Sequence, residues 1–192
     1  MGIGGGNALN FSRRRTIEFA RQLETISTFL AAKGHRHALA GALALAAYGL
    51  PRTTLDLDIV VEASARPNIV AFLEGLGYTT LYQSAGYSNH VHSDPSLPRV
   101  DFIYVDEKTG HRLFEAAKRF PGPAGREVLV PKPEHLAAMK VLAMKNDPTR
   151  RFQDMADIRF LMTLPGIDKE EIRDSFERYG LGERFRELEE DV

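Results

Sequence analysis

Two aspartates, Asp56 and Asp58, interrupt a run that is otherwise typical of a buried strand, "LPRTTLDLDIVVE". Successive side chains of a strand point to opposite faces, so both carboxylates share one face, roughly 6 to 7 Å apart. Carboxylates this close repel each other and resist burial unless a cation lies between them. Magnesium prefers hard oxygen ligands and keeps positions open for phosphates. The pair therefore predicts a divalent metal site, the alternative being a strand whose polar face meets solvent.

A third aspartate stands alone in a second apolar run, "RVDFIYV". Alternation places Asp101 on the same face as Ile103 and Val105. If the two strands are neighbours, three carboxylates can hold two metal ions about 3.5 to 4 Å apart. Such a pair of ions activates an attacking oxygen and stabilises the leaving one in phosphoryl or nucleotidyl transfer. The sequence alone does not establish that the strands are adjacent.

A lysine lies on the packing face of a predicted C-terminal helix. Lys140 shares a helical row with Leu136 and Met144, so its ammonium must reach water along its stem or meet an anion. Asp154 and Asp157 are three residues apart on the next predicted helix. Two interpretations stay open: an ion pair of Lys140 with Asp157 between the helices, or a lysine that reaches a phosphate while Asp157 orients it.

The elements that position these residues follow from hydrophobic period and from Gly and Pro breakers. Strands are expected within residues 35–41, 55–62, 79–83, 87–92, 99–105 and 126–131. Helices are expected over residues 14–33, 42–48, 67–76, 111–118, 134–145, 149–163 and 168–179. This order predicts an α/β (α+β) fold with a mixed β-sheet flanked by helices. We expect a flexible N-terminus over residues 1–12, an α/β domain over 13–130, and a helical segment over 131–192 packed on it.

Composition limits the classes of function. The 192 residues carry a net charge of −1, which gives no overall signature of a dedicated nucleic-acid binder, although a local basic patch stays possible. The absence of cysteine excludes disulfides, thiolate catalysis and zinc–thiolate sites. The longest apolar run, residues 38–50, is too short to cross a bilayer, and residues 1–7 do not resemble a secretory signal. We therefore expect a cytoplasmic protein that does not enter a membrane.

The order and spacing of these motifs resemble the minimal nucleotidyltransferase superfamily, and within it the AbiEii toxin type and its uncharacterised relatives. The resemblance covers residues 38–161 and includes "VPKPEHLAAMKVLAMKNDPTRRFQDMADIRFL" near the C-terminus. Its N-terminal motifs match at Gly41, Gly49, Arg52, Thr54, Asp56, Asp58 and Asp101.

The resemblance implies a palm fold like that of polymerase β and transfer of NMP from an NTP with Mg²⁺ or Mn²⁺. It implies that the metal is held by Asp56, Asp58 and Asp101, which are also catalytic together with Lys140 and Asp157. The phosphates are expected near Gly41, Ala42, Arg52 and Thr54, since backbone amides at a helix start and an arginine both bind phosphate. Ala42 departs from the pattern, because a serine or second glycine is common there, and this removes a hydroxyl contact to the triphosphate.

Acceptors in the superfamily range from tRNA ends to proteins and small antibiotics, and some members are toxins paired with an antitoxin. The resemblance therefore implies an NTP substrate, an acceptor that is tRNA, protein or a small molecule, and a cognate antitoxin as a possible partner. The near-neutral charge argues mildly against a large RNA acceptor. Two alternatives stay open: a non-catalytic nucleotide-binding or antitoxin-like partner with the same fold, and a phosphodiesterase-like metal hydrolase.

Overall fold

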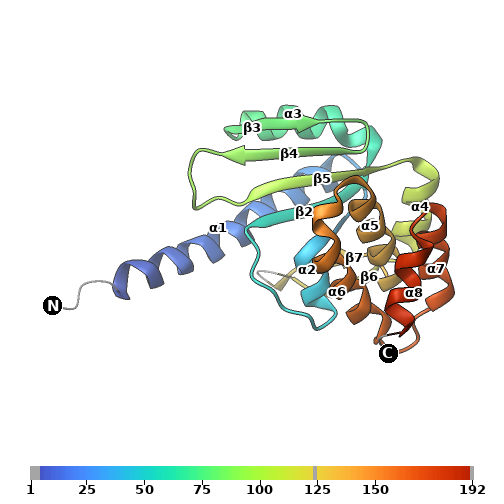
Figure 1. Ribbon diagram of the computed structural model, residues 1–192. Coiled ribbons are helices and arrows are strands. Elements are labelled where there is room, and N and C mark those ends of the chain that lie inside the picture. The colour runs from blue at the N-terminus through green and yellow to red at the C-terminus, as the bar shows by residue number, and fades with distance from the viewer. Residues whose placement is uncertain (1–4, 123–124, 191–192) are drawn as a thin grey trace. The chain divides into compact units, whose positions relative to one another are not determined.

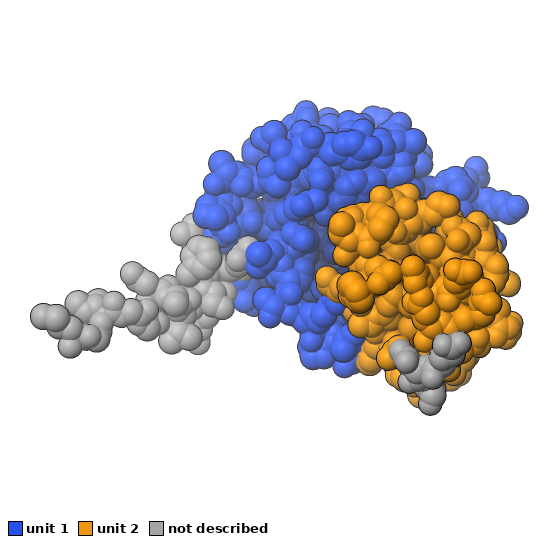
Figure 2. Space-filling view, viewed as in Figure 1, with its two compact units in different colours: residues 1–130 blue, residues 131–192 orange. Residues whose placement is uncertain are grey.

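A computed structural model describes residues 5–122 and 125–190 of the chain. The chain forms two compact units, Met1–Val130 and Pro131–Val192, which Figure 2 shows in different colours. The first unit contains the sheet, and the second contains helices only in its described residues.

The first unit is built on a mixed five-stranded sheet with the strand order β1-β2-β5-β4-β3 (Figure 1). The neighbours β2 and β5 run parallel, and the other three pairs are antiparallel. This sheet with its flanking helices confirms the predicted fold class. The strands are β1 (His37–Leu39), β2 (Asp56–Glu62), β3 (Tyr78–Gln83), β4 (Tyr87–His92) and β5 (Arg99–Val105).

One face of the sheet forms the main core. Leu57, Ile59 and Val61 of β2 alternate with the aspartates and are fully buried, as the period of two predicts. Helices α1 (Gly5–Ala32) and α3 (Arg66–Gly75) meet through stacked rings of Phe29 and Phe72, whose centroids lie 3.8 Å apart. The other face of β2 carries Asp56 and Asp58, followed by Val60, which is also fully buried.

The remaining elements of the first unit include a second, two-stranded sheet. It consists of β6 (Lys118–Pro121) and β7 (Glu127–Val130), which pair antiparallel. The strand β6 was not predicted, because "KRFP" has neither alternation nor β-branched residues. The helix expected over 111–118 begins earlier, where Asp106 caps it by accepting a hydrogen bond from the Thr109 amide at 2.8 Å. The bounds are α2 (Gly41–Ala47), η1 (Ala63–Ala65), α4 (Glu107–Glu115), β6 (Lys118–Pro121) and β7 (Glu127–Val130).

The second unit packs its helices around a small apolar core. Ile158, Leu161, Phe176 and Phe185 are each at most 1% exposed. Residues 182–190, which follow the last helix expected from the sequence, form the helix α8 (Gly182–Glu190), and Phe185 of this helix joins that core. The elements are α5 (Pro133–Asn146), η3 (Pro148–Arg150), α6 (Arg151–Met162), α7 (Lys169–Arg178) and α8 (Gly182–Glu190). Across the described part of the chain, no helix has both the length and the apolarity needed to span a bilayer.

The helix α1 is longer than its sequence pattern predicts. It begins at Gly5, so residues 5–12, expected as part of a flexible terminus, are helical, while residues 1–4 lie outside the described residues. The apolar period marks only the segment that packs, where Leu23, Ile26 and Leu30 are at most 4% exposed. Periodicity reports burial rather than helix length, which accounts for the difference.

Candidate active site

The three predicted aspartates lie on adjacent strands. The parallel register of β2 and β5 sets Asp58 opposite Asp101 and Asp56 opposite Arg99. Asp101 is 6% exposed, whereas Asp56 and Asp58 are half-buried. Because directly opposed residues of neighbouring strands share a face, the three carboxylates project from one face of the sheet.

Gly41 leaves room for the Asp58 carboxylate. Its φ is +56°, and a Cβ built there would lie 1.9 Å from Asp58 Oδ2. The approach is fixed by the backbone, since the amide of Ala40 donates to the Asp58 carbonyl at 2.9 Å just before α2 begins. Only glycine combines this conformation with so close a contact. Ala42 follows as the second residue of α2 and is half-buried.

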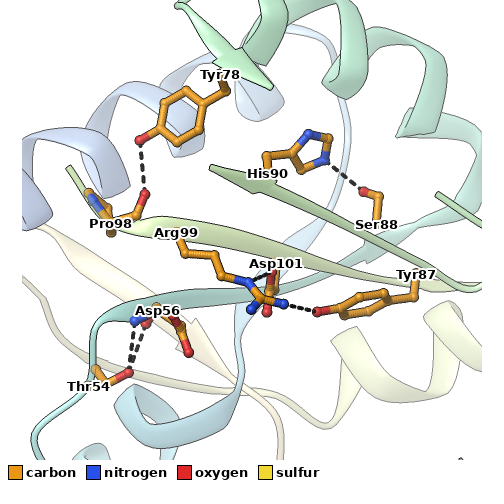
Figure 3. Close-up of polar contacts among 9 residues, drawn as sticks. All are labelled: Thr54, Asp56, Tyr78, Tyr87, Ser88, His90, Pro98, Arg99 and Asp101. Atoms are coloured by element: carbon orange, nitrogen blue, oxygen red, sulfur yellow. Dashed lines mark hydrogen bonds and ion pairs between the residues drawn. The ribbon is translucent and has the colours of Figure 1, made fainter. Parts of the chain in front are cut away.

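Arg99 and Tyr87 surround the third aspartate (Figure 3). Arg99 Nε donates to Asp101 Oδ1 at 2.9 Å, and Arg99 Nη2 lies 3.4 Å from the Tyr87 hydroxyl. Burial, followed by the hydrogen bond and charge of Asp101, raises the pKa of Tyr87, so this phenol stays protonated. Burial alone acts to lower the pKa of Arg99, but its contacts with Asp101 and Tyr87 outweigh that effect and raise it.

Arg52 and Thr54 lie in the loop that leads into β2. The Thr54 hydroxyl accepts from the Asp56 amide and donates to the Asp56 carbonyl, each at 3.1 Å (Figure 3). This contact fixes the backbone at the point where the strand of aspartates begins. Arg52 is half-buried, two residues earlier. The structure therefore brings Thr54 into contact with Asp56. The expected role of Arg52 and Thr54 toward phosphate stays a prediction.

A separate polar chain runs through the opposite face of the sheet. The Ser88 hydroxyl hydrogen-bonds His90 Nε2 at 2.8 Å and the Tyr104 hydroxyl at 2.7 Å, and His90 Nδ1 lies 3.1 Å from the Thr80 hydroxyl. Ser88 and His90 are fully buried, and burial lowers the pKa of His90. Alternation along β4 directs these side chains away from Tyr87, so they stabilise the core behind the aspartates.

In the second unit, Lys140 joins α5 to α6 by ion pairs. Its Nζ lies 3.0 Å from Asp154 Oδ1 and 2.5 Å from Asp157 Oδ2, and both aspartates are 1% exposed. Arg150 Nε adds a contact to Asp154 Oδ2 at 3.3 Å. The ion pair that the sequence offered as one interpretation is therefore present, with Asp154 as an added member. A role for Lys140 and Asp157 toward phosphate stays a prediction.

The aspartates on β2 and β5 fit a divalent cation in their donor chemistry. Carboxylate oxygens are the ligands that Mg²⁺ and Mn²⁺ prefer, and the space that a side chain at position 41 would fill lies against Asp58 Oδ2. Among residues 16–122 and 125–189, whose side chains the structure describes, no three His, Cys, Asp or Glu side chains already converge as a metal site. Arg99 instead holds one oxygen of Asp101.

Sequence reasoning missed Arg99 and Tyr87. The signal for Arg99 was present, because residues 99 and 101 of one strand share a face. Tyr87 could not be placed in this way. Its position depends on the antiparallel register of β4 with β5, which sets Tyr87 opposite Ile103 and Asn89 opposite Asp101.

Comparison with protein families gives a match over most of the chain. Residues 28–190 match the family described as "Nucleotidyl transferase AbiEii toxin, Type IV TA system". The matched segment contains every predicted site residue. Comparison with curated protein sequences gives no match.

Solved structures with a similar fold include two of ANT(2'')-Ia and one of a nucleotidyltransferase-like protein. The solution structure of the antibiotic-resistance factor ANT(2'')-Ia is 15% identical, with a TM-score of 0.63 over 90% of this chain and 95% of that one. The crystal structure of ANT(2'')-Ia in complex with adenylyl-2''-tobramycin is 14% identical, with a TM-score of 0.61 over 84% and 96%. An antigenic nucleotidyltransferase-like protein from Paracoccidioides brasiliensis is 14% identical, with a TM-score of 0.51 over 90% and 92%. At this identity the likeness concerns the fold.

Proposed function

The chain belongs to the AbiEii family of nucleotidyltransferases, and we propose that it transfers NMP from an NTP to an acceptor hydroxyl in a metal-dependent reaction. One observation carries the proposal: Asp58 and Asp101 are register partners on adjacent parallel strands. Gly41 supports it, because its missing side chain makes the space in which the Asp58 carboxylate lies. Carboxylates gathered on one face repel each other, and a cation bound among them offsets that repulsion.

The three aspartates are proposed to bind the metal, and Asp101 is also proposed to act as the base. Asp56, Asp58 and Asp101 would hold Mg²⁺ or Mn²⁺, which when bound supplies positive charge to the phosphates and polarises the reacting oxygens. Asp101, the most buried of the three, takes the proton of the acceptor hydroxyl. The acceptor oxygen then bonds to the α-phosphorus in line, and the bond from that phosphorus to the bridging oxygen breaks to release pyrophosphate.

The surrounding residues position the triphosphate. Arg52 is proposed to bind phosphate oxygens through its planar guanidinium. Ala42 has no hydroxyl to contribute, so the further donors to phosphate are backbone amides near Gly41 and Ala42. Thr54 acts on the site through the Asp56 backbone that it already contacts.

Lys140 stays a proposed phosphate contact. Asp157, which already pairs with its ammonium, would orient it. The competing interpretation is a purely structural ion pair between α5 and α6, and it is supported by the burial of Asp154 and Asp157.

The proposed acceptor is a hydroxyl of tRNA, of a protein or of a small molecule. The structure of ANT(2'')-Ia was solved with adenylyl-2''-tobramycin, which is a precedent for a small-molecule acceptor on this fold. The family description supports a role as the toxin of a toxin–antitoxin pair, with a cognate antitoxin as partner. We place this activity in the cytoplasm.

A second candidate function is a nucleotide-binding, antitoxin-like protein that no longer transfers. Two features favour it. Ala42 lacks the hydroxyl expected at that position, and Arg99 occupies one oxygen of Asp101, which leaves fewer donors for a metal. A metal hydrolase of the phosphodiesterase type is a third candidate, because the same three carboxylates would serve it.

The test is label transfer. The protein is mixed with each NTP labelled at the α-phosphate, with Mg²⁺ or Mn²⁺, and with bulk tRNA, cell protein or aminoglycosides. Our proposal predicts that label moves to one acceptor class and that Asp58→Ala abolishes the transfer. Asp106→Asn is the matched control, since asparagine retains the capping contact to α4 and leaves the aspartates of β2 and β5 untouched.

The outcomes separate the three candidates. Transfer that persists in Asp58→Ala would refute the proposed mechanism. Nucleotide binding without transfer to any acceptor favours the binding protein. Breakdown of the NTP without a labelled acceptor favours the hydrolase.

A further inference from the structure

Arg99 carries a positive charge into a cluster of carboxylates. It lies two residues before Asp101 on β5, and its register partner on β2 is Asp56. The Asp101 side chain is 9% exposed, whereas that of Arg99 is 40% exposed. The carboxylate is therefore buried, while the guanidinium that compensates it still reaches water. A buried carboxylate without a cationic partner destabilises the folded protein, and Arg99 provides that partner for Asp101.

The contact engages one of the two carboxylate oxygens of Asp101. Arg99 Nε donates to Oδ1 at 2.9 Å, and Nη2 extends toward the Tyr87 hydroxyl at 3.4 Å (Figure 3). A metal ligand must offer a lone pair, and a lone pair engaged by a guanidinium is not available at the same time.

We propose that Arg99 is a tethered cation that competes with the divalent metal for Asp101. This inference rests on the proposed function, because it assumes that the aspartates bind a metal. In the metal-free protein, Arg99 compensates the charge of Asp101 and thereby stabilises the fold. Metal binding displaces the guanidinium from Asp101 Oδ1. The displaced guanidinium moves into solvent, which the partly exposed Arg99 side chain already reaches. The consequence is a raised threshold: the site fills only above the metal concentration at which the ion outcompetes Arg99.

The competition makes opposite predictions for two properties of one variant. Arg99→Met removes the charge but keeps an unbranched side chain. It should lower the melting temperature of the metal-free protein, since Asp101 loses its partner. It should also tighten Mn²⁺ binding by about tenfold or more, the scale of a hydrogen bond to a charged group. A merely structural arginine would cause the first change without the second.

The experiment is Mn²⁺ binding without nucleotide, followed by electron paramagnetic resonance of the free ion. Arg99→Lys keeps the charge and should stay close to the wild-type dissociation constant. Arg119→Met is the matched control, because Arg119 pairs with Glu127 on the exposed β6–β7 sheet and should leave the constant unchanged. In an Asp101→Asn background, adding Arg99→Met should have no further effect, since the competition acts through Asp101.

The outcomes distinguish this inference from the function on which it rests. If the wild type binds Mn²⁺ and Arg99→Met binds equally or more weakly, the inference is overturned and the proposed metal site stands. If neither binds Mn²⁺, the metal-dependent function fails and the inference fails with it. Binding by Arg99→Met alone supports the inference in its strongest form.

Discussion

Gly41→Ala tests whether the approach of α2 to β2 sets the position of Asp58. A Cβ at position 41 would lie 1.9 Å from Oδ2, 2.6 Å from Cγ and 3.0 Å from Cβ of Asp58. Since the whole side chain of Asp58 is too close, moving the carboxylate tip alone cannot relieve the overlap. We expect Asp58 to leave its rotamer and the site to lose its metal affinity and its transfer activity.

The stability cost has two parts. A non-glycine residue in the left-handed region costs about 1–2 kcal/mol, and displacing Asp58 from its rotamer adds about 0.5–1.5 kcal/mol. The sum, about 1.5–3.5 kcal/mol, lowers the melting temperature by about 2–4 °C per kcal/mol for a chain of this size. Thermal unfolding followed by circular dichroism measures this shift, and Mn²⁺ binding measures the effect on the site.

Gly34→Ala provides the matched control. Gly34 has a φ of +73°, and a Cβ there meets nothing within 4 Å. The control therefore carries the backbone cost without the contact to Asp58, so we expect it to lose about 1–2 kcal/mol of stability and no metal affinity. If Gly41→Ala kept the Mn²⁺ affinity and activity of Gly34→Ala, the argument that Gly41 positions Asp58 would be wrong.

Two further predictions concern buried charge. Lys140→Met leaves the carboxylates of Asp154 and Asp157 buried without their ammonium, so urea unfolding should show that the free energy of unfolding falls by about 3–5 kcal/mol. Lys145 is exposed, so Lys145→Met should lower it by no more than about 1 kcal/mol. Equal losses in the two variants would contradict the ion-pair account. Burial lowers the pKa of His90 from its ordinary value of 6.5, so below that pH the unfolded chain binds a proton that the folded one does not. Stability should therefore fall with decreasing pH, by up to about 1.4 kcal/mol per unit from this residue, and His90→Gln should flatten the slope.

The sequence predicted most strands, and it predicted the face on which the aspartates lie. Alternation in the first half of β2 separates the buried Leu57 and Ile59 from the half-buried Asp56 and Asp58, and it ends at Val60, which is also fully buried. Helix ends were less well predicted, because capping by Asp106 decides where α4 begins and hydrophobic period does not.

The pairing of strands could not be predicted. Asp58 and Asp101 are far apart in the chain, and β3 and β4 lie between their strands in sequence but beyond β5 in the sheet. Local patterns contain no information about such a parallel crossover. The contact of Arg99 with Asp101 was accessible from spacing alone, and that of Tyr87 with Arg99 required the register of β4.

The measurement that most directly tests the central claim is the rate of nucleotidyl transfer in Asp58→Asn, Asp101→Asn and the double variant, against Asp106→Asn. We predict that each single substitution lowers the rate by at least about a hundredfold, as loss of a group that acts on the transition state does. Since the two aspartates act as one centre, the double variant should be no slower than the slower single variant. A rate near that of Asp106→Asn in either single variant, or losses that multiply in the double variant, would contradict a shared centre on β2 and β5.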